Sequence, residues 1–291
     1  MIDFTQLKYF AKLAEVLSFT EAAKQLFITQ STLSQSIAKM EHELGVQLFD
    51  RIGHRLYLNE AGKLFFPNAV QTIRHAEEGI QKLRDMQQIY LCDLHIGVTY
   101  SLCPTLVHGL SLFSHRFPQV KVRVSYSTSI SEILESVKNN KMDFAITYRP
   151  SPLDPSIEGV DLFHSLLCVI LDKQHALASS DSISLEELAN YPLILPASGL
   201  HTRKLLDNLL TRKGFVLHPT IEVNEISMIT QVLYHSRWVS ILTQNSVLGN
   251  PLLKAVPLAE RSGLMRASIL WPKGGYKKKM AKELADILLN E

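Results

Sequence analysis

Hydrophobic residues in the first sixty positions recur at the spacing of an α-helix. In residues 29–44 the apolar positions lie three or four residues apart, which predicts a helix with one apolar face: Leu33, Ile37, Met40 and Leu44. The same spacing predicts two earlier helices, the first with Phe4, Leu7, Phe10, Ala14 and Leu17, and the second with Ala22, Ala23 and Leu26. Thr20 and Thr29 are suitable N-cap residues for the second and third helices. The pattern therefore predicts three short helices around one core.

The polar face of the third predicted helix, within residues 29–36, holds Gln, Ser and Thr and no charge. A face that meets only water would normally hold Glu and Lys, which favour helix more strongly. Hydroxyl and amide side chains cost helix stability, but they can hydrogen-bond to base edges and phosphates. We interpret the segment as the reading helix of a helix-turn-helix. The alternative is a small three-helix unit whose polar face is simply solvated.

A glycine-centred turn follows this helix. Residues 49–59 alternate on both sides of Gly53, which favours a short hairpin, or wing. Positive charge gathers on it, although acidic residues slightly outnumber basic ones up to Glu60. An arginine at such a tip can follow the DNA backbone or enter the minor groove, while the alternative is a solvated turn. The candidate DNA-binding residues are Thr29, Gln30, Ser31, Thr32, Ser34, Gln35, Lys39, Arg51, His54 and Arg55.

Residues 61–89 predict a long amphipathic helix. Its apolar positions alternate by threes and fours, which is a heptad seam that needs a partner helix: Phe66, Ala69, Ile73, Ala76, Ile80 and Leu83. Pro67 predicts a bend or a restart of the helix near Phe66. The seam predicts a dimer, which would place two reading helices on half-sites about one turn of DNA apart. The alternative is one helix packed on its own domain.

From about residue 90, short apolar strands alternate with helices. Strands are predicted at residues 94–98, 121–126, 144–147, 166–171, 193–195, 220–223, 239–242 and 264–270, and helices at 104–117, 129–139, 202–213, 226–235 and from about 276. This alternation predicts parallel sheets with right-handed crossovers. We expect two α/β lobes, joined by two crossings, with a cleft between them.

Hydroxyl-bearing residues follow several of these strands. Clefts in such sheets lie at the carboxyl ends of the strands, and free helix N-termini with hydroxyls favour an anion. We therefore expect a small carboxylate or a similar polar metabolite, with Arg149 or Arg203 as additional contacts. Each hydroxyl has the alternative role of an N-cap. The candidate ligand-binding residues are Thr99, Ser101, Thr128, Ser129, Thr147, Tyr148, Ser198, His201 and Thr202.

Several motifs together resemble the LysR-type transcriptional regulators, over nearly all of the 291 residues. They are Ala22-Ala23 with Leu26, Q-S-T-L-S-Q-S-I at 30–37, E-x-E-L-G-V-x-L-F-x-R at 41–51, N-E-A-G at 59–62, L-H-I-G at 94–97, F-P-Q-V at 117–120, M-D-F-A-I at 142–146 and P-L-I at 192–194. The resemblance implies an α+β multidomain protein. Its parts are a winged helix-turn-helix (1–60), a linker and dimerisation helix (61–89), and a two-lobed α/β effector domain (90–291) that resembles periplasmic binding proteins. Lobe I would take about 90–162 and 266–291, and lobe II about 163–265.

The sequence departs from that family at several positions. Members often carry Pro or Ala where Ser31 and Thr32 stand, and Arg where Gln35 stands. Gln suits a bidentate contact to adenine rather than guanine, so the operator preference of relatives does not transfer. Trp238 replaces a small residue of a Gly-rich turn, and Thr243 stands where Pro is common. We expect Trp238 to narrow or reshape the cleft.

Composition excludes several other classes. No stretch is long and apolar enough to span a membrane, and the N-terminus has no signal-peptide pattern. The three cysteines are too few and too far apart for a disulfide framework, and the histidines lack metal-site spacing. No cofactor loop, metal cluster or triad spacing indicates an enzyme. We expect a cytoplasmic regulator with no cofactor and no metal.

The predicted function is a bacterial DNA-binding regulator that responds to a small ligand. Its expected partners are double-stranded operator DNA, a small-molecule effector and further copies of the chain, as a homodimer or, from the resemblance, a tetramer; RNA polymerase is a further candidate. Two alternatives stay open: a redox-responsive regulator using Cys103, which lies near a predicted helix N-terminus, and a solute-binding receptor without a DNA function.

Overall fold

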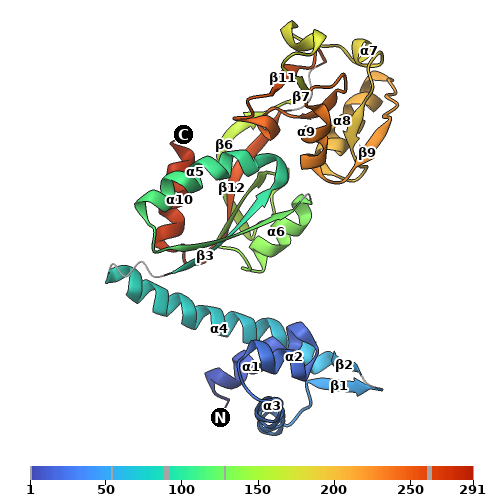
Figure 1. Ribbon diagram of the computed structural model, residues 1–291. Helices are drawn as coiled ribbons and strands as arrows, with labels where there is room; N and C mark the ends of the chain where they lie inside the picture. The colour runs from blue at the N-terminus through green and yellow to red at the C-terminus, as the bar shows by residue number, and fades with distance from the viewer. Residues whose placement is uncertain (1, 54, 88–91, 128, 261–263, 291) are drawn as a thin grey trace. The chain divides into compact units, whose positions relative to one another are not determined.

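The computed structural model describes residues 2–53, 55–87, 92–127, 129–260 and 264–290, and the chain forms two compact units (Figure 1). Unit 1 is Met1–Gln88 and unit 2 is Ile89–Glu291. Each unit is described on its own. Among the described residues, no helix combines the length and the apolar character needed to cross a membrane.

Unit 1 consists of helices and one hairpin. Its elements are α1 (Phe4–Val16), α2 (Phe19–Gln25), α3 (Gln30–Leu44), β1 (Phe49–Ile52), β2 (Arg55–Leu58) and α4 (Glu60–Met86). The core forms where the apolar faces meet, with Phe10, Leu33 and Met40 fully buried. The hairpin pairs β1 with β2 in antiparallel register around a turn at Gly53, whose φ is +60°. The three predicted helices and the predicted hairpin are confirmed.

The predicted N-caps are half correct. Thr29 caps α3, accepting a hydrogen bond from the Thr32 N–H at 3.1 Å. The cap of α2, however, is Ser18 and not Thr20. Ser18 has an extended backbone, and its hydroxyl accepts from the Glu21 N–H. Thr20 therefore lies inside the first turn of α2, and its hydroxyl is not needed as a cap.

Helix α4 continues without interruption through Pro67, so the predicted restart is wrong. A proline inside a helix removes one backbone hydrogen bond, but contacts with α1 hold this part of α4 in place. Ala69 is 1% exposed, and Phe66 packs against the same core. Two of the six predicted seam positions, Phe66 and Ala69, thus belong to the core of unit 1 itself. Only the later positions remain open, with Ile80 at 49% and Leu83 at 61% exposure.

Lobe I of unit 2 is built on a five-stranded sheet. Its elements are β3 (Asp93–Thr99), η1 (Tyr100–Leu102), α5 (Cys103–Arg116), β4 (Lys121–Ser127), α6 (Ile130–Lys138), β5 (Phe144–Tyr148), β6 (Ile157–Ser165), β12 (Met265–Pro272) and α10 (Lys279–Leu289). The strand order is β4-β3-β5-β12-β6. The first three strands are parallel, as predicted, but β12 is antiparallel to both of its neighbours. The sheet is therefore mixed, because β12 returns from the second lobe.

Lobe II repeats this arrangement. Its elements are β7 (Leu167–Asp172), η2 (Ala176–Ser179), α7 (Leu185–Leu188), β8 (Ile194–Pro196), α8 (His201–Lys213), β9 (Ile221–Val223), α9 (Ile226–Leu233), β10 (Ser240–Thr243), η3 (Gln244–Val247) and β11 (Leu253–Pro257). A bridge between Leu193 and Val239 joins the β8-β9 pair to the β10-β7-β11 sheet. The resulting order, β9-β8-β10-β7-β11, corresponds strand for strand to that of lobe I.

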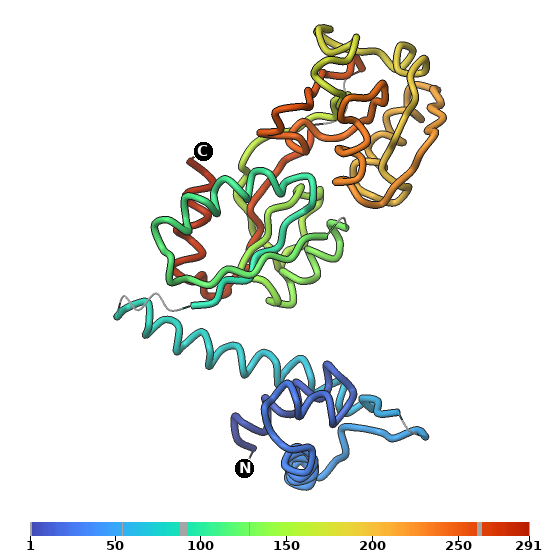
Figure 2. The backbone as a smooth tube through the Cα atoms, viewed as in Figure 1, coloured from blue at the N-terminus to red at the C-terminus, as the bar shows by residue number. Residues whose placement is uncertain are grey.

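Two passages connect the lobes, as predicted, and they run side by side (Figure 2). Strand β6 pairs with β12 up to Ser165, which lies opposite Met265. A single residue, Leu166, then separates β6 from β7. The expected lobe boundary after residue 162 therefore falls inside β6, a strand that the sequence analysis missed.

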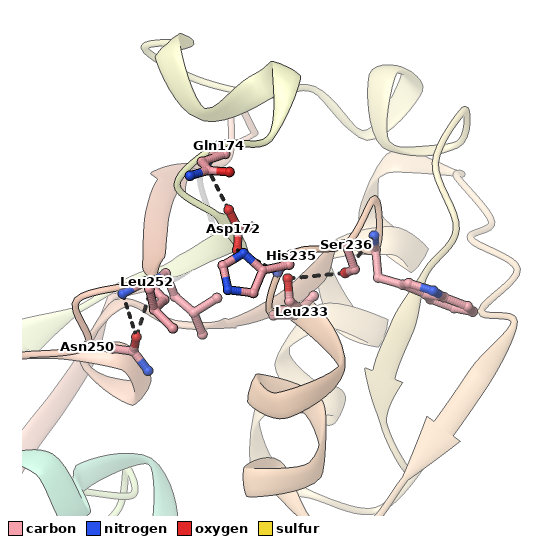
Figure 3. A network of polar contacts seen from close by, with 9 residues as sticks. Asp172, Gln174, Leu233, His235, Ser236, Asn250 and Leu252 are labelled. Atoms are coloured by element: carbon pink, nitrogen blue, oxygen red, sulfur yellow. Dashed lines mark hydrogen bonds and ion pairs between the residues drawn. The ribbon is translucent and has the colours of Figure 1, made fainter.

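The turn after α9 contains no glycine, yet one of its residues adopts a left-handed backbone conformation. His235 adopts φ +50°, a conformation that normally favours glycine. The buried Asp172 carboxylate holds it there by accepting the His235 N–H at 2.7 Å and the Gln174 N–H at 2.8 Å (Figure 3). These two backbone hydrogen bonds lower the pKa of Asp172.

Trp238 does not narrow the cleft as expected. It precedes β10 and packs into the second hydrophobic cluster of lobe II, with Ile170 and Leu233 among the residues of that cluster. Position 238 thus lies at the amino end of its strand. The cleft lies at the carboxyl ends, so Trp238 belongs to the packing of the lobe.

Candidate functional site

The polar face of α3 is open to solvent. Leu33, Ile37 and Met40 point into the core, and the other side of the helix carries the predicted readers. Of these, Ser34 is partly exposed and the rest are exposed: Thr29, Gln30, Ser31, Thr32, Gln35 and Lys39. The structure therefore brings all the α3 candidates to one surface.

Three hydroxyls at the start of α3 bond to one another. The Thr29 Oγ1 lies 2.8 Å from both the Ser31 Oγ and the Thr32 Oγ1. This small cluster fixes the first turn of the helix. Ser34 and Gln35, one turn further on, make no side-chain hydrogen bond to any residue that the structure describes.

The wing places cationic side chains beside the same helix. Arg51, in β1, lies over the ring of Phe19 at 5.2 Å, which is a cation–π contact. Arg51 and Arg55 line a groove of about 610 Å³ together with Thr20 and Gln30. His54 lies outside the described residues. Hydroxyls, amides and arginines thus share one concave surface in unit 1.

In unit 2, four of the predicted ligand residues meet where the strands of lobe I end. Thr99 ends β3 and Ser101 lies directly after it in η1, while Thr147 and Tyr148 end β5. All four are buried. The Thr99 and Thr147 hydroxyls hydrogen-bond to each other at 2.5 Å, so this pair holds neighbouring strands together.

Lobe II contributes the start of α8. His201 and Thr202 are the first two residues of this helix, and Leu200 at its N-cap offers no side-chain acceptor. The His201 ring stacks on Tyr148 with centroids 5.6 Å apart. The carboxyl end of β5 and the N-terminus of α8 therefore meet, as the sequence predicted. Ser198 is exposed in the preceding loop.

Another predicted ligand residue, Ser129, does not join this group. Ser129 is the N-cap of α6, and its hydroxyl also bonds to Ser131 at 2.9 Å. Its capping role, one of the two alternatives, is thus confirmed. Thr128 lies outside the described residues.

Burial is the main cause of the pKa shifts of Tyr148 and His201. The Tyr148 hydroxyl has no partner in hydrogen-bonding geometry within the described part of the chain. Burial raises its pKa, against the opposing effect of the neighbouring Thr243, Ser101 and Ser165 hydroxyls. Burial lowers the pKa of His201 to about 4, with a smaller contribution from Lys204. The imidazole is therefore neutral at physiological pH.

The two arginines proposed as anion contacts are engaged elsewhere. Arg203 pairs with Asp207 and Glu222 and donates to the Pro196 carbonyl at 2.9 Å. Arg149 pairs with Asp161 at 3.5 Å. These carboxylates compete with any ligand, so the expected arginine contact is not supported.

The sequence analysis missed Tyr100, Tyr126 and Glu225. The rings of Tyr100 and Tyr126 meet edge to face with centroids 5.8 Å apart. The Glu225 carboxylate caps α9 by accepting from the Ser227 N–H at 3.2 Å. Glu is not a preferred N-cap residue, so only its position directly before an apolar helix could have indicated this role. The α9 N-terminus is thereby closed to an external anion.

Cys103 does not have the properties of a redox sensor. Burial, followed by the negative charge of Glu225, raises the pKa of Cys103 to about 11. Burial raises the pKa of Cys168 to about 11 as well. A reactive cysteine needs a thiolate, so the redox alternative is not supported, even though Cys103 is the first residue of α5.

Comparison with known proteins identifies both units. Residues 4–63 match the model of the bacterial regulatory helix-turn-helix protein, lysR family, and residues 93–291 match the LysR substrate binding domain. A winged helix-turn-helix followed by two α/β lobes defines a ligand-responsive DNA-binding regulator. The chain belongs to the LysR family of transcriptional regulators, as the motifs predicted, and it is not an enzyme.

Curated relatives match along most of their length. The transcriptional regulator YybE of Bacillus subtilis is 27% identical over 290 residues, covering 99% of each chain. The transcriptional activator CmpR of Synechocystis is 30% identical over 246 residues, covering 83% of this chain and 79% of its own.

Solved structures share the fold. A full-length OxyR variant from Pseudomonas aeruginosa superposes with a TM-score of 0.70 at 20% identity, covering 100% of this chain and 94% of its own. Full-length CbnR in complex with its target DNA gives 0.66 at 19% identity, with 99% of both chains covered.

Proposed function

We propose that this regulator reads operator DNA with the polar face of α3 and steadies itself on the backbone with the arginines of its wing. One observation supports this proposal: the uncharged hydroxyl-and-amide face of α3 is exposed to solvent. The buried apolar face of the same helix holds it in this orientation. Arg51 and Arg55 line a groove together with Gln30 of this helix. Amides and hydroxyls suit base edges, and Arg suits phosphates. A protein that reads chromosomal DNA acts in the cytoplasm.

The C-terminal part of α4 is suited to pair with the same helix of a second copy of the chain. Ile80 and Leu83 recur on one side of the helix and are exposed. A heptad stripe of this kind is buried when two helices pair. Pairing would bring two reading helices to two half-sites.

The ligand that unit 2 fits is a small molecule with an acceptor group for the N-terminus of α8. Free N–H groups there and the unpaired Tyr148 hydroxyl could donate to a carboxylate. His201 is neutral, and the positive charge of Arg203 is offset by Asp207 and Glu222. A ligand held mainly by dipoles and hydroxyls would bind modestly and depend little on salt.

Regulation would then be a two-state equilibrium. The ligand changes DNA binding only if it binds unequally to two arrangements of the protein. Residues of both lobes, Tyr148 and His201, touch each other at the cleft. A ligand inserted beside them would favour one arrangement of the lobes over another.

The test of DNA reading uses fluorescence anisotropy with the duplex upstream of the protein's own gene. Gln35→Ala should weaken binding about tenfold or more, since one good bidentate base contact contributes about 1–3 kcal/mol. The matched control is Gln71→Ala, which removes the same amide from an exposed position of α4. Equal affinities for the two variants would refute the assignment of α3.

The test of pairing uses sedimentation of the full chain. Ile80→Asp with Leu83→Asp should shift dimers to monomers. Leu64→Asp is the control, because Leu64 is an exposed leucine on another face of the same helix. Dissociation by the control alone would contradict the stripe as the interface.

A further inference from the structure

The two glutamines of the reading surface are not equivalent. Gln30, the first residue of α3, accepts a hydrogen bond from the Thr20 hydroxyl at 3.3 Å between Oγ1 and Oε1. Gln35 makes no side-chain hydrogen bond to any described residue. The Gln30 carbonyl oxygen is therefore engaged within the protein, while both ends of the Gln35 amide are free.

Thr20 is available for this contact because it has no other role in the fold. Ser18, and not Thr20, caps α2. Thr20 is exposed, in the first turn of α2, and lines the same groove as Gln30 and Arg51. A hydroxyl that is neither a cap nor part of the core is positioned here by the packing of α2 on α3.

The neighbouring hydroxyls do not compete for the Gln30 amide. Thr29, Ser31 and Thr32 bond to one another. The contact from α2 is thus the only one recorded for the Gln30 side chain among the described residues. It holds the amide oxygen toward Thr20, and the NH₂ group makes no hydrogen bond to any described residue.

We propose that Thr20 is a positioning residue that sets the base preference of Gln30. An amide with its oxygen engaged presents two donors, which suit the acceptors of guanine (N7 and O6) or thymine (O4) in the major groove. An amide with both ends free pairs bidentately with adenine N6 and N7. Gln30 then selects guanine or thymine, and Gln35 selects adenine.

The two glutamines read different base pairs. Their positions differ by five, so they stand about 7.5 Å apart along the helix axis. This distance corresponds to about two base steps of 3.4 Å. Each glutamine should therefore determine the base preference at a separate position of the selected sequences. The inference rests on the proposed reading of DNA by α3.

The experiment is selection from a randomised duplex library by the full-length chain, followed by sequencing. Gln30→Ala identifies the base position that Gln30 reads, as the position at which preference disappears. The wild-type protein should enrich guanine or thymine there. Thr20→Val, which keeps the shape and removes the hydroxyl, should shift that position toward adenine by roughly tenfold. Thr20→Ser, which keeps the hydroxyl, should restore the wild-type preference.

The outcomes separate the alternatives. If Thr20→Val lowers affinity for all sequences equally and leaves every base preference unchanged, Thr20 contacts the backbone and the proposal is wrong. If the preference moves with Thr20→Ser as much as with Thr20→Val, packing rather than the hydroxyl is responsible. Failure of the wild-type chain to enrich any sequence would overturn the reading of DNA by α3 itself. Circular dichroism of each variant checks that α2 and α3 are intact.

Discussion

The reading face of α3 and the cleft of unit 2 use the same chemistry in opposite settings. Both surfaces are rich in hydroxyls. On α3, Thr29, Ser31 and Thr32 are exposed and bond to one another at the surface. In unit 2, Thr99 and Thr147 are buried, and their mutual bond lies between strands.

The difference in burial predicts how the removal of a hydroxyl affects stability and binding at each surface. Exposed hydroxyls that do not cap a helix contribute little to folding because water replaces their partners, so removal of the Ser31 hydroxyl should affect binding alone. Thr29 is the exception, because its hydroxyl caps α3. Buried hydroxyls carry a desolvation cost that only their hydrogen bonds offset. Changes in the cleft should therefore alter stability together with ligand binding, and the predictions below separate the two effects.

The largest effect is expected at Asp172, the extreme case of a buried polar group in unit 2. Asp172→Ala removes the acceptor of the His235 and Gln174 N–H groups. Loss of two hydrogen bonds to a charged acceptor should lower the free energy of unfolding by about 2–5 kcal/mol, measured by urea denaturation. The control is His235→Gly, which keeps the backbone donor and suits φ +50°, so its stability should stay within about 1 kcal/mol. Equal losses in both variants would show that the turn tolerates no change.

The next effect depends on pH and concerns His201. Its pKa of about 4 lies below the ordinary 6.5, so the unfolded chain binds the proton first. The folded state should lose stability as pH falls from about 6.5 toward 4, by roughly 2 kcal/mol at pH 5. Comparison of unfolding at pH 7.5 and pH 5 should show a smaller loss in His201→Gln than in the wild-type protein. The same pH dependence in both proteins would mean that His201 is accessible to protons in the folded state.

On the exposed surface, the expected loss is in binding and not in folding. Ser34→Ala with Gln35→Ala should weaken specific DNA binding by about 1–3 kcal/mol, as determined by anisotropy. The melting temperature should stay unchanged, because neither side chain makes a hydrogen bond within the described part of the chain. A large drop in melting temperature would remove the distinction between the two surfaces.

A smaller effect is expected for the threonine pair of the cleft. Thr147→Val leaves the Thr99 hydroxyl without its partner and should cost about 1 kcal/mol of stability. Replacing both threonines by valine should recover most of this loss, since no buried donor then remains unpaired. A double variant less stable than the single one would indicate that the hydroxyls bond to something else in the cleft.

The smallest effect is expected at Tyr148. Its hydroxyl is buried without a partner among the described residues, so Tyr148→Phe should change stability by no more than about 0.5 kcal/mol, and it should not destabilise the fold as Thr147→Val does. Calorimetry of the two variants makes this comparison. Screening of a metabolite panel by melting-temperature shift would then show whether the hydroxyl serves the ligand.

The sequence predicted those elements whose patterns are periodic. The apolar stripe of α3 and the alternation of β3 with α5 led directly to the observed helices and strands. Strand β6 was missed because it is half exposed and shows no strict alternation. The antiparallel direction of β12 could not be predicted either, since it follows from the return of the chain between the lobes.

Side-chain roles were harder to predict than elements. Pro67 inside α4 is tolerated through packing against α1, which no local rule reveals. Arg203 is occupied by Asp207 and Glu222, the second of which lies nineteen residues away. Tyr148 and His201 meet although fifty-three positions separate them in the sequence. Contacts between distant segments decide these roles, and a single sequence does not contain them explicitly.

Helix α4 moves together with the reading surface. Phe66 and Ala69 pack its first half against the core that carries α3, and its 27 residues give it a length of about 40 Å. If the helix tilts by about 5° about one of its ends, the other end moves by about 3.5 Å, which is close to the rise of one base pair. We expect a tilt of this size, in a dimer, to shift the two reading helices relative to each other by about one base pair.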